Sequence, residues 1–360
     1  MSGARRSRPR PLRGDSPKPT VSIVVPCYNY GRFLPSCVES CVGQTDVDVD
    51  VIVVDDASTD GSDSVAAALA AHDDRVQVVQ HERNLGHIAT YNDGLERVTG
   101  DYLVLLSADD LLVPGALSRA VSLMETWPTV GLVYGHPLLF EDRLPVPRTV
   151  ARSWTIWPGA EWIAKQSRRA TSIIYSPEAV VRADVQREVG GYRSDLPHTG
   201  DMEMWLRVAA VADIGRVNGA DQAFRREHPA SMMATTFAGE LVDLEERRRA
   251  FDEFFNGPGH DIPGGGQARA VAYQALARQA LELACVLNGK GASHNVAELV
   301  AFARDVFPGL ERLRVWRELE WRRRVASDGE AFAALRRGVY DVKRDVEGRV
   351  RWRRWYWSGV

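Results

Sequence analysis

The sequence predicts an α/β fold built on a parallel sheet, followed by a helical C-terminal region. Two patterns predict this. β-branched and apolar runs alternate with helically spaced segments through the first hundred residues, whereas long Ala- and Arg-rich helical patterns dominate after about residue 236. With 360 residues, 45% hydrophobic and 26% charged, the chain is long enough for one large domain or two.

The first hundred residues alternate predicted strands and helices. The strands are expected at 21–26, within 47–54, at 76–79 and at 102–106, and the helices at 33–41, 62–71 and 88–98. Each strand is a β-branched or apolar run, and each helix carries good helix formers or apolar residues one turn apart. Because β-α-β units connect with right-handed crossovers, these four strands are expected to be parallel.

Two adjacent carboxylates, Asp109 and Asp110, follow the apolar strand 102–106. Burying both without a partner is costly, so one interpretation is a cation held where the strand ends. The carboxyl edge of a parallel sheet is also where open α/β folds bind ligands. The other interpretation is a solvated turn with Asp110 as the N-cap of the next helix. This stretch alone favours neither interpretation.

Polar residues follow three of the predicted strands. They are Tyr28 and Asn29, then Asp55 and Asp56, then Asp109 and Asp110. In a parallel sheet all three groups fall at the same edge. No GxGxxG follows the first strand and no GxxxxGK[ST] occurs, which argues against a dinucleotide dehydrogenase and a P-loop NTPase. Carboxylates at this edge can still accept hydrogen bonds from a nucleobase and ribose, and hold a metal on a diphosphate.

The middle of the chain continues the α/β pattern less regularly. A helix is expected at 117–127, a strand at 130–134, a strand or loop at 172–177, a helix at 178–189 and a strand near 214–217. Residues 141–170 are rich in proline and tryptophan with poor periodicity, and are expected to form a long loop over the sheet edge. Asp201 opens another helix, where the helix dipole and amide N–H groups favour a carboxylate.

The predicted domain organisation has three parts. They are a disordered basic tail over 1–19, an α/β domain over 20–235 and a helical region over 236–360. The helical patterns of the last part cover 240–255, 268–287, 292–306 and 309–324, and their amphipathic character would allow a homodimer. Residues 349–357 interleave arginine with aromatics, which leaves three alternatives: a docked helix end, a nucleic-acid patch or an interfacial membrane anchor.

The composition predicts a cytoplasmic protein. The four cysteines, Cys27, Cys37, Cys41 and Cys285, show neither zinc-ribbon nor disulfide-framework spacing and are interpreted as small apolar residues. No apolar run is long enough to span a bilayer, and the N-terminus lacks the apolar segment of a signal peptide. The net charge of −3 gives no general attraction to nucleic acid.

Taken in order, the motifs resemble the family-2 glycosyltransferases, whose GT-A fold is a mixed, mostly parallel sheet flanked by helices. The resemblance covers about residues 19–231. It rests on Val21-Ser-Ile-Val-Val-Pro-Cys-Tyr-Asn, Val54-Asp-Asp-Ala-Ser-Thr-Asp, Asn84-Leu-Gly, Tyr91-Asn-Asp-Gly, Gly100-Asp-Tyr, Ser107-Ala-Asp-Asp, Gly190-Gly-Tyr, Gly200-Asp-Met-Glu-Met-Trp-Leu-Arg and Arg226-Glu-His-Pro-Ala-Ser. Each motif is weak alone, and the ordered set is specific.

The resemblance implies a nucleotide-binding role for Pro26, Tyr28, Asp56 and Asp109. Tyr28 would lie against the nucleobase, Asp56 would accept a hydrogen bond from its imide N–H, and Asp109 would approach the ribose. The alternatives are that Tyr28 is a packing residue and that Asp56 only supports the following helix.

The resemblance also implies Mn²⁺ or Mg²⁺ on the donor diphosphate, held by Asp110 and Asp109 with His228 nearby. The family's metal motif is usually written DxD, and here Ser107 occupies its first acidic position, so Asp110 is expected to be the chief ligand. Asp201 matches the family's general base. The structural alternatives are a helix cap for Asp201 and a hydrogen-bonded structural histidine for His228.

The resulting hypothesis is an inverting, metal-dependent glycosyltransferase. It would move a sugar from a UDP- or dTDP-sugar donor to a hydroxyl of a sugar, lipid-linked or small-molecule acceptor. The basic N-terminus and residues 349–357 would permit peripheral contact with the inner face of a membrane. The alternatives are a nucleotidyltransferase and an inactive nucleotide-sugar-binding protein. The first normally needs a basic, glycine-rich segment after the first strand, which residues 27–31 do not supply.

Overall fold

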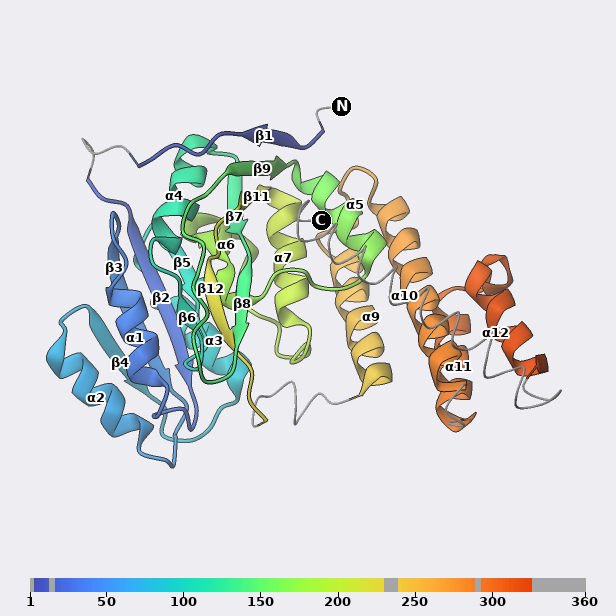
Figure 1. Ribbon diagram of the computed structural model, residues 1–360, viewed down its shortest axis with the longest axis horizontal. Helices are drawn as coiled ribbons and strands as arrows, with labels where there is room; N and C mark the ends of the chain where they lie inside the picture. Colours follow the sequence, from blue (N-terminus) through green and yellow to red (C-terminus); the bar gives the residue numbers. More distant parts are fainter. Residues whose placement is uncertain (1–2, 13–16, 230–238, 289–292, 326–360) are drawn as a thin grey trace. The chain divides into compact units, whose positions relative to one another are not determined.

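A computed structural model describes residues 3–12, 17–229, 239–288 and 293–325 (Figure 1). The chain divides into two compact units. Unit 1 comprises residues 1–163 and 172–236, and unit 2 comprises residues 164–171 and 237–360. The Arg- and Trp-rich residues 349–357 lie outside the described residues.

Unit 1 is built on a mixed sheet with the strand order β1-β9-β11-β7-β10-β5-β2-β3-β4. Its strands are β1 (Arg5–Ser7), β2 (Thr20–Cys27), β3 (Asp48–Asp55), β4 (Val76–Gln80), β5 (Tyr102–Leu105), β7 (Val130–Tyr134), β9 (Ser153–Trp157), β10 (Val180–Arg182) and β11 (Asp213–Asn218). Strands β5, β2, β3 and β4 are parallel neighbours, as the sequence predicts.

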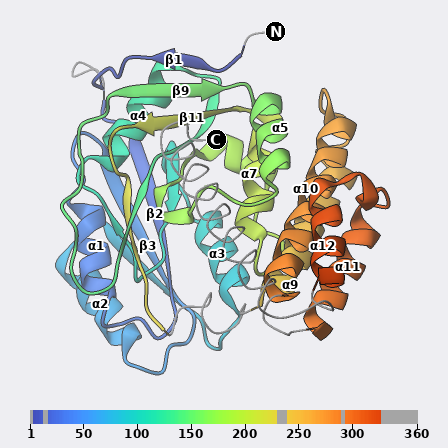
Figure 2. The ribbon, with the colours of Figure 1, turned by 45° about the vertical axis from the view of Figure 1, so that its right-hand side comes forward.

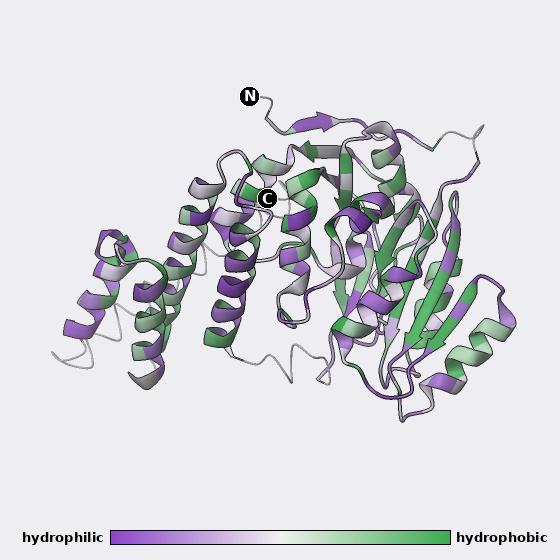
Figure 3. Cartoon of the chain, turned by 180° about the vertical axis from the view of Figure 1, so that it is seen from behind, coloured by the Kyte–Doolittle hydropathy of each residue, from purple (hydrophilic) through white to green (hydrophobic). Residues whose placement is uncertain are grey.

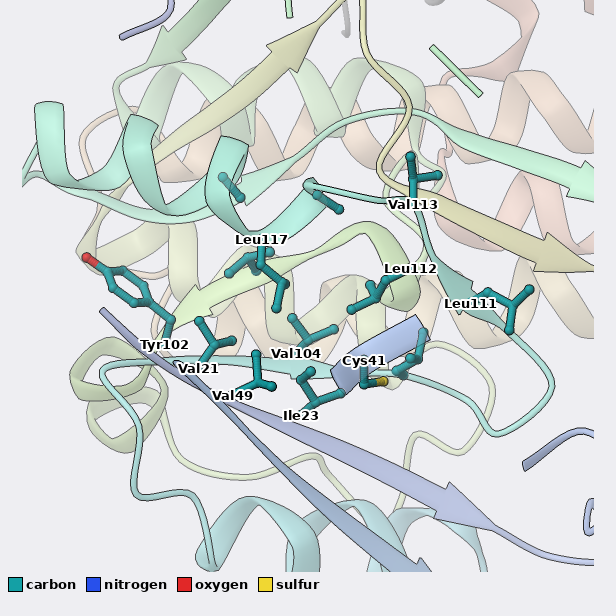
Figure 4. Close-up of a cluster of buried hydrophobic side chains, with 14 of the residues drawn as sticks. Val21, Ile23, Cys41, Val49, Tyr102, Val104, Leu111, Leu112, Val113 and Leu117 are labelled. Atoms are coloured by element: carbon teal, nitrogen blue, oxygen red, sulfur yellow. The ribbon is translucent and has the colours of Figure 1, made fainter. Parts of the chain in front are cut away.

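Helices cover both faces of the parallel block (Figures 1 and 2). The helices of unit 1 are α1 (Leu34–Val42), α2 (Ser62–His72), α3 (His87–Glu96), α4 (Ala116–Thr126), α6 (Ala183–Val189) and α7 (Gly200–Val211), and α5 (Gly159–Arg169) begins there. On one face, Val21 and Ile23 of β2 point into a cluster with Cys41 of α1 and Leu117 of α4 (Figure 4). The four cysteines are buried and unpaired, which fits their interpretation as small apolar residues.

The other face of β2 and β3 is closed by α3, and Gly94 allows the close approach. A Cβ at Gly94 would lie 2.2 Å from Cγ1 of Val24 and 3.3 Å from Cγ2 of Val54. Burial on both faces explains why β2 and β3 read as continuous β-branched runs instead of alternating polar and apolar residues.

The structure corrects the long loop expected at 141–170. This segment contains strand β9 and the whole of helix α5. The buried residues Trp154, Ile156 and Trp157 anchor β9, which pairs with β11 on one side. The five-residue strand is too short for a clear periodicity, and its stability comes from pairing partners far away in sequence.

Two further expectations need correction. The helix expected at 178–189 is only α6, because Val180 and Val181 form β10 between β5 and β7. The tail expected to be disordered contains β1, which pairs antiparallel with β9. The edge of β9 offers unpaired backbone groups, and the Arg5 guanidinium lies 5.9 Å from the centroid of the Trp127 ring.

A small second sheet brings the segment before His228 to the carboxylate pair. It consists of β6 (Leu111–Leu112), β12 (Ala223–Arg226) and β8 (Pro137–Phe140) in the order β6-β12-β8. Strand β12 runs antiparallel to β6 and parallel to β8. Because β6 starts directly after Asp110, this pairing fixes β12 beside the end of β5.

Unit 2 is helical. It contains the end of α5 with α9 (Glu240–Asn256), α10 (Gly265–Asn288), α11 (Ser293–Val306) and α12 (Arg314–Val325), and the short 3₁₀ helix η2 (Leu310–Arg312). Arg247 is buried and donates to the carbonyl of Ala170 and to Gln279 Oε1 at 2.6 and 2.7 Å. These helices mix hydrophobic and hydrophilic residues, whereas the central strands of unit 1 are mostly hydrophobic (Figure 3). No helix among the described residues combines the length and the apolar character needed to cross a membrane.

Candidate functional site

The carboxyl ends of β2, β3 and β5 meet at one edge of the sheet. Cys27 at the end of β2 pairs with Asp55 at the end of β3. Beyond β5, the N–H of Leu106 donates to the carbonyl of Val24 at 2.9 Å. The three predicted polar groups therefore follow adjacent strands, as expected.

The loops after β2 and β3 are tied together by Asn29, whose φ is +59°. Its backbone N–H donates to Ser58 Oγ at 2.9 Å, and its side-chain oxygen accepts from the N–H of Thr59 at 2.8 Å. Beside it, the Tyr28 side chain is 47% exposed, and Pro26 is half-buried on β2. The Tyr28 ring is thus presented at the sheet edge, where a planar ligand can reach it.

The Asp56 carboxylate is buried and organises the next loop. It accepts hydrogen bonds from the N–H groups of Leu85 and Gly86 at 2.7 and 3.0 Å, and its Oδ1 lies 2.8 Å from His81 Nδ1. Burial alone would raise the pKa of this carboxyl, but the bonds from His81, Leu85 and Gly86 outweigh burial and lower the pKa. A carboxylate offers about four acceptor positions, so one remains for a donor on a ligand.

His81 is a residue that the motifs missed. Its ring is 8% exposed and bridges two carboxylates, with Nδ1 on Asp56 and Nε2 3.2 Å from Asp93 Oδ2. Burial lowers the pKa of His81, but Asp56 and Asp93 outweigh this effect and raise the pKa. His81 directly follows β4, so the rule that singled out residues after the other three strands would have found it.

Asp109 and Asp110 are both buried, in a turn closed by the Asp110 N–H donating to the carbonyl of Ser107 at 2.9 Å. Asp109 Oδ2 lies 3.0 Å from His228 Nε2, and Asp110 Oδ1 accepts from the N–H of Arg226 at 2.8 Å. Burial, followed by the charge of Asp109, raises the pKa of Asp110 well above its usual range. In the described part of the chain, the buried Asp109 Oδ1 has no hydrogen-bond partner.

Arg226 holds this region in place, and the motifs assigned it no role. Its Nε donates to the carbonyl of Asp109 and its Nη1 to that of Glu141, both at 3.0 Å. The guanidinium also lies 4.5 Å from the ring centroid of Phe33. The Phe33 ring is in turn 5.6 Å from the His228 ring, which orients the imidazole beside Asp109.

The structure brings the three predicted metal-binding residues, Asp109, Asp110 and His228, together. Among residues 3–12, 17–229, 239–288 and 293–325, however, no group of three or more His, Cys, Asp or Glu side chains is arranged to hold a metal. The crowded negative charge and the unpartnered Asp109 oxygen suit a divalent cation whose remaining ligands come from elsewhere.

Asp201 lies in the first turn of α7. Its Oδ1 accepts from the N–H of Met202 at 2.6 Å. Burial raises the pKa of Asp201 to about 6, against the opposing effects of the Met202 N–H, His198 and Arg225. A carboxyl with this pKa is ionised at neutral pH and is a stronger base than an ordinary aspartate.

Tyr91 on α3 links Asp201 to the carboxylate pair. Burial raises the pKa of Tyr91, and the charges of Asp201, Asp109 and Asp110 raise it further. Its ring contacts Tyr192 with the centroids 5.5 Å apart. All three carboxylates therefore act on the same tyrosine hydroxyl.

Comparisons with known proteins agree with this architecture. A family model described as glycosyl transferase family 2 matches residues 22–179. EpsE of Bacillus subtilis is 32% identical over 192 residues, which is 52% of this chain and 66% of EpsE, just under two thirds of that protein. Residues 22–179 of this chain therefore carry a region similar to the family-2 glycosyltransferases.

Solved structures show the same GT-A fold. TarS 1–349 of S. aureus in complex with UDP-GlcNAc superposes with a TM-score of 0.55 and 16% identity, covering 71% of each chain. The mannosyltransferase PcManGT of Pyrobaculum calidifontis, in complex with GDP-Man and Mn²⁺, gives a TM-score of 0.59 and 17% identity, covering 97% of this chain and 85% of that one. At such identities the likeness concerns the fold.

Proposed function

We propose that this glycosyltransferase transfers a sugar from a nucleotide-diphosphate donor to an acceptor hydroxyl, with inversion at the anomeric carbon. The observation that carries the proposal is the arrangement of three carboxylates, Asp109, Asp110 and Asp201, in unit 1. Two of them are adjacent and buried at the carboxyl edge of the sheet, and the third is a separate base at the start of α7. This division suits a reaction in which one end of the substrate carries a diphosphate and the other loses a proton.

The nucleotide would lie over the carboxyl ends of β2 and β3. The exposed Tyr28 ring would contact the base, the remaining acceptor position of Asp56 would take its N–H, and Asp109 would approach the ribose. Pro26 would line the same edge. UDP- and dTDP-sugars remain the proposed donors, and GDP-mannose belongs in the donor screen because the mannosyltransferase of like fold holds it.

Asp110 and Asp109, with His228 beside them, are the proposed residues for Mn²⁺ or Mg²⁺. The cation would supply Lewis-acid neutralisation of the charge that develops on the leaving diphosphate. Two protein carboxylates would leave coordination positions of the cation for diphosphate oxygens. Arg226 keeps the two carboxylates in place through its backbone N–H and its guanidinium.

Asp201 is the proposed general base. Its carboxylate takes the proton of the acceptor hydroxyl while that oxygen forms a bond to the anomeric carbon. The bond from the anomeric carbon to the diphosphate oxygen breaks, and its electron pair leaves with the nucleotide diphosphate. A single displacement from the face opposite the leaving group inverts the configuration.

The test is a thermal-shift screen of UDP-, dTDP- and GDP-sugars with and without Mn²⁺, followed by a transfer assay with the donor that binds. Asp201→Asn should keep nucleotide binding within about twofold and lower transfer about 10²–10⁴-fold. Asp110→Asn should lose the Mn²⁺-dependent part of nucleotide binding. Asp261→Asn, at a side chain that is 94% exposed, is the matched control. Undiminished transfer by Asp201→Asn would refute its role as the base.

A further inference from the structure

Arg225 is a half-buried cation near the site that no described acceptor uses. Arg226 is engaged by two carbonyls, and Arg207 is engaged by Glu203 and by the carbonyl of Gly191. Arg225 is half-buried on β12, and within the described residues its guanidinium has a ring contact with Tyr175 and no hydrogen bond. A partly desolvated guanidinium with five donors and no acceptor favours an anionic partner.

Strand geometry turns Arg225 away from the carboxylate turn. Successive side chains of a strand point to opposite faces, and the next residue, Arg226, packs on Phe33 and Phe140 beside Asp109. Arg225 faces the other way, where its guanidinium lies 4.6 Å from the ring centroid of Tyr175. The two adjacent arginine side chains therefore point to opposite faces of β12, Arg226 towards Asp109 and Arg225 towards Tyr175.

Tyr175 is an exposed aromatic ring on a fixed turn. Its side chain is 39% exposed, yet its backbone N–H donates to Glu178 Oε1 at 3.1 Å, and the N–H of Glu178 donates back to the Tyr175 carbonyl at 3.2 Å. Glu178 is buried in the 3₁₀ helix η1 (Ser176–Glu178). A large apolar surface held at low entropic cost is suited to stacking against a sugar ring.

The Arg225–Tyr175 pair lies within electrostatic reach of both the base and the carboxylate pair. The positive charge of Arg225 acts on Asp201 as well as on Asp110. Ser176, which follows Tyr175, interacts with the hydroxyl of Tyr192, and Tyr192 packs on Tyr91. The exposed Tyr175 ring and the Arg225 guanidinium are therefore connected to the residues around Asp201.

We propose that Arg225 and Tyr175 form an acceptor subsite for a sugar that bears an anionic group, a carboxylate or a phosphate. The guanidinium pairs with the anion, the Tyr175 ring stacks on the sugar, and the acceptor hydroxyl is thereby placed at Asp201. This inference rests on the proposed function and gives it an acceptor class. Carboxylates and phosphates share the planar or tripodal oxygen pattern that an arginine fork recognises.

The experiment measures binding of three acceptor probes to the full chain saturated with UDP and Mn²⁺, or with whichever nucleotide the donor screen selects. The probes are methyl glucuronide, glucose 6-phosphate and neutral methyl glucoside. Wild type should bind at least one anionic probe at least tenfold more tightly than the neutral one, and the probe that binds identifies carboxylate or phosphate. Arg225→Gln should abolish that preference, and Arg225→Lys should retain part of it. Tyr175→Ala should lower the binding affinity for every sugar that wild type binds.

The nucleotide dissociation constant is measured in parallel for each variant and reports correct folding of the donor side. Arg143→Gln removes the same charge from an exposed loop residue and should behave as wild type. A tenfold loss of nucleotide affinity in Arg225→Gln, with the sugar preference intact, would assign Arg225 to the donor and overturn the proposal. Wild type that binds nucleotide but shows no preference for anionic sugars would also overturn it, whereas failure to bind any nucleotide would refute the proposed function itself.

Discussion

The behaviour of Asp201 follows from its burial at the start of α7. With a pKa of about 6, the side chain is protonated in mild acid and cannot accept the acceptor proton. We expect the transfer rate at saturating donor to rise about tenfold per pH unit below pH 6 and to level off above it. A pH profile of the wild-type enzyme checks this. The groups that share its surroundings are His198, Arg225, Tyr91 and Tyr192.

The raised pKa of Asp201 also means that its ionisation lowers the free energy of unfolding, and substituting Asp201 should reveal this effect. The folded-state pKa of Asp201 lies above the ordinary value of 3.8, so ionisation is harder in the folded protein than in the unfolded chain. This penalty is absent below about pH 4 and fully present above about pH 6. Asp201→Asn should therefore be more stable than wild type by roughly 1–3 kcal/mol at pH 7.5.

Denaturant unfolding of both proteins at pH 7.5 and pH 4 measures this difference. The gap between them should shrink to near zero at the lower pH. An Asn variant that is no more stable than wild type at pH 7.5 would show that Asp201 ionises without strain in the folded protein.

His81 shows how a residue outside the motifs supports one inside them. Its ring fixes Asp56 from one side, while the N–H groups of Leu85 and Gly86 fix it from the other. His81→Ala removes one bond to a buried carboxylate and leaves Asp93 without this partner. We expect nucleotide affinity to fall by about one to two orders of magnitude, since such a bond contributes about 1.5–3 kcal/mol. Calorimetric titration measures it, with His260→Ala, at an exposed ring, as the control.

At the level of elements, the parallel strands were predictable and the antiparallel additions were not. Strands β2 and β3 are buried on both faces, so their continuous β-branched runs are enough to predict them from the local sequence. Strand β10 has three residues, and β1 lies among arginines and prolines. Both exist because β5, β7 and β9 offer backbone partners, and that information lies far away in the sequence.

The candidate site divides in the same way. Residues directly after parallel strands could be located from the sequence, because a parallel sheet places all strand ends at one edge. Arg225 and Arg226 could not be located in this way, since their position depends on the pairing of β12 with β6 and β8. Strand β6 has only two residues, too few for any periodic signal.

The packing of α3 on the sheet gives a prediction at the level of elements. Gly94→Ala would place a methyl group 2.2 Å from Val24 Cγ1, which forces α3 away from β2. We expect a loss of about 1–3 kcal/mol in the free energy of unfolding despite the better helix propensity of alanine. Gly266→Ala is the matched control, because this glycine lies in the first turn of α10 and has nothing within 4 Å of an added Cβ.

Chemical denaturation of the two variants separates packing from propensity. Gly266→Ala should gain up to about 1 kcal/mol, mainly by restricting the unfolded chain. If Gly94→Ala were also stabilising, α3 would have room to move, and the close approach of α3 to β2 would not be a requirement of the fold.

For the whole molecule, the site and the stability of the fold are linked through the carboxylate pair. Two adjacent buried carboxylates repel each other, and Asp109 Oδ1 has no partner among the described residues. Without ligands, Asp110→Asn removes one of these charges and keeps an oxygen for the Arg226 N–H. We therefore expect this variant to melt at a higher temperature than wild type.

Ligands should reverse that order. A ligand present at about 100 times its dissociation constant adds about 2.7 kcal/mol to the free energy of unfolding of a protein that binds it, and nucleotide with Mn²⁺ should act in this way. Wild type should then melt above Asp110→Asn, because the variant lacks the carboxylate that the cation needs. Thermal melts of both proteins, with and without ligands, and after chelation, measure the crossing. Equal ligand-induced shifts of the melting temperature in the two proteins would show that Asp110 does not bind the cation. A wild type that melts higher than the variant even without ligands would show that other groups in the fold compensate the repulsion between Asp109 and Asp110. A crossing would mean that the charge repulsion which weakens the free protein is the same feature that binds the cation.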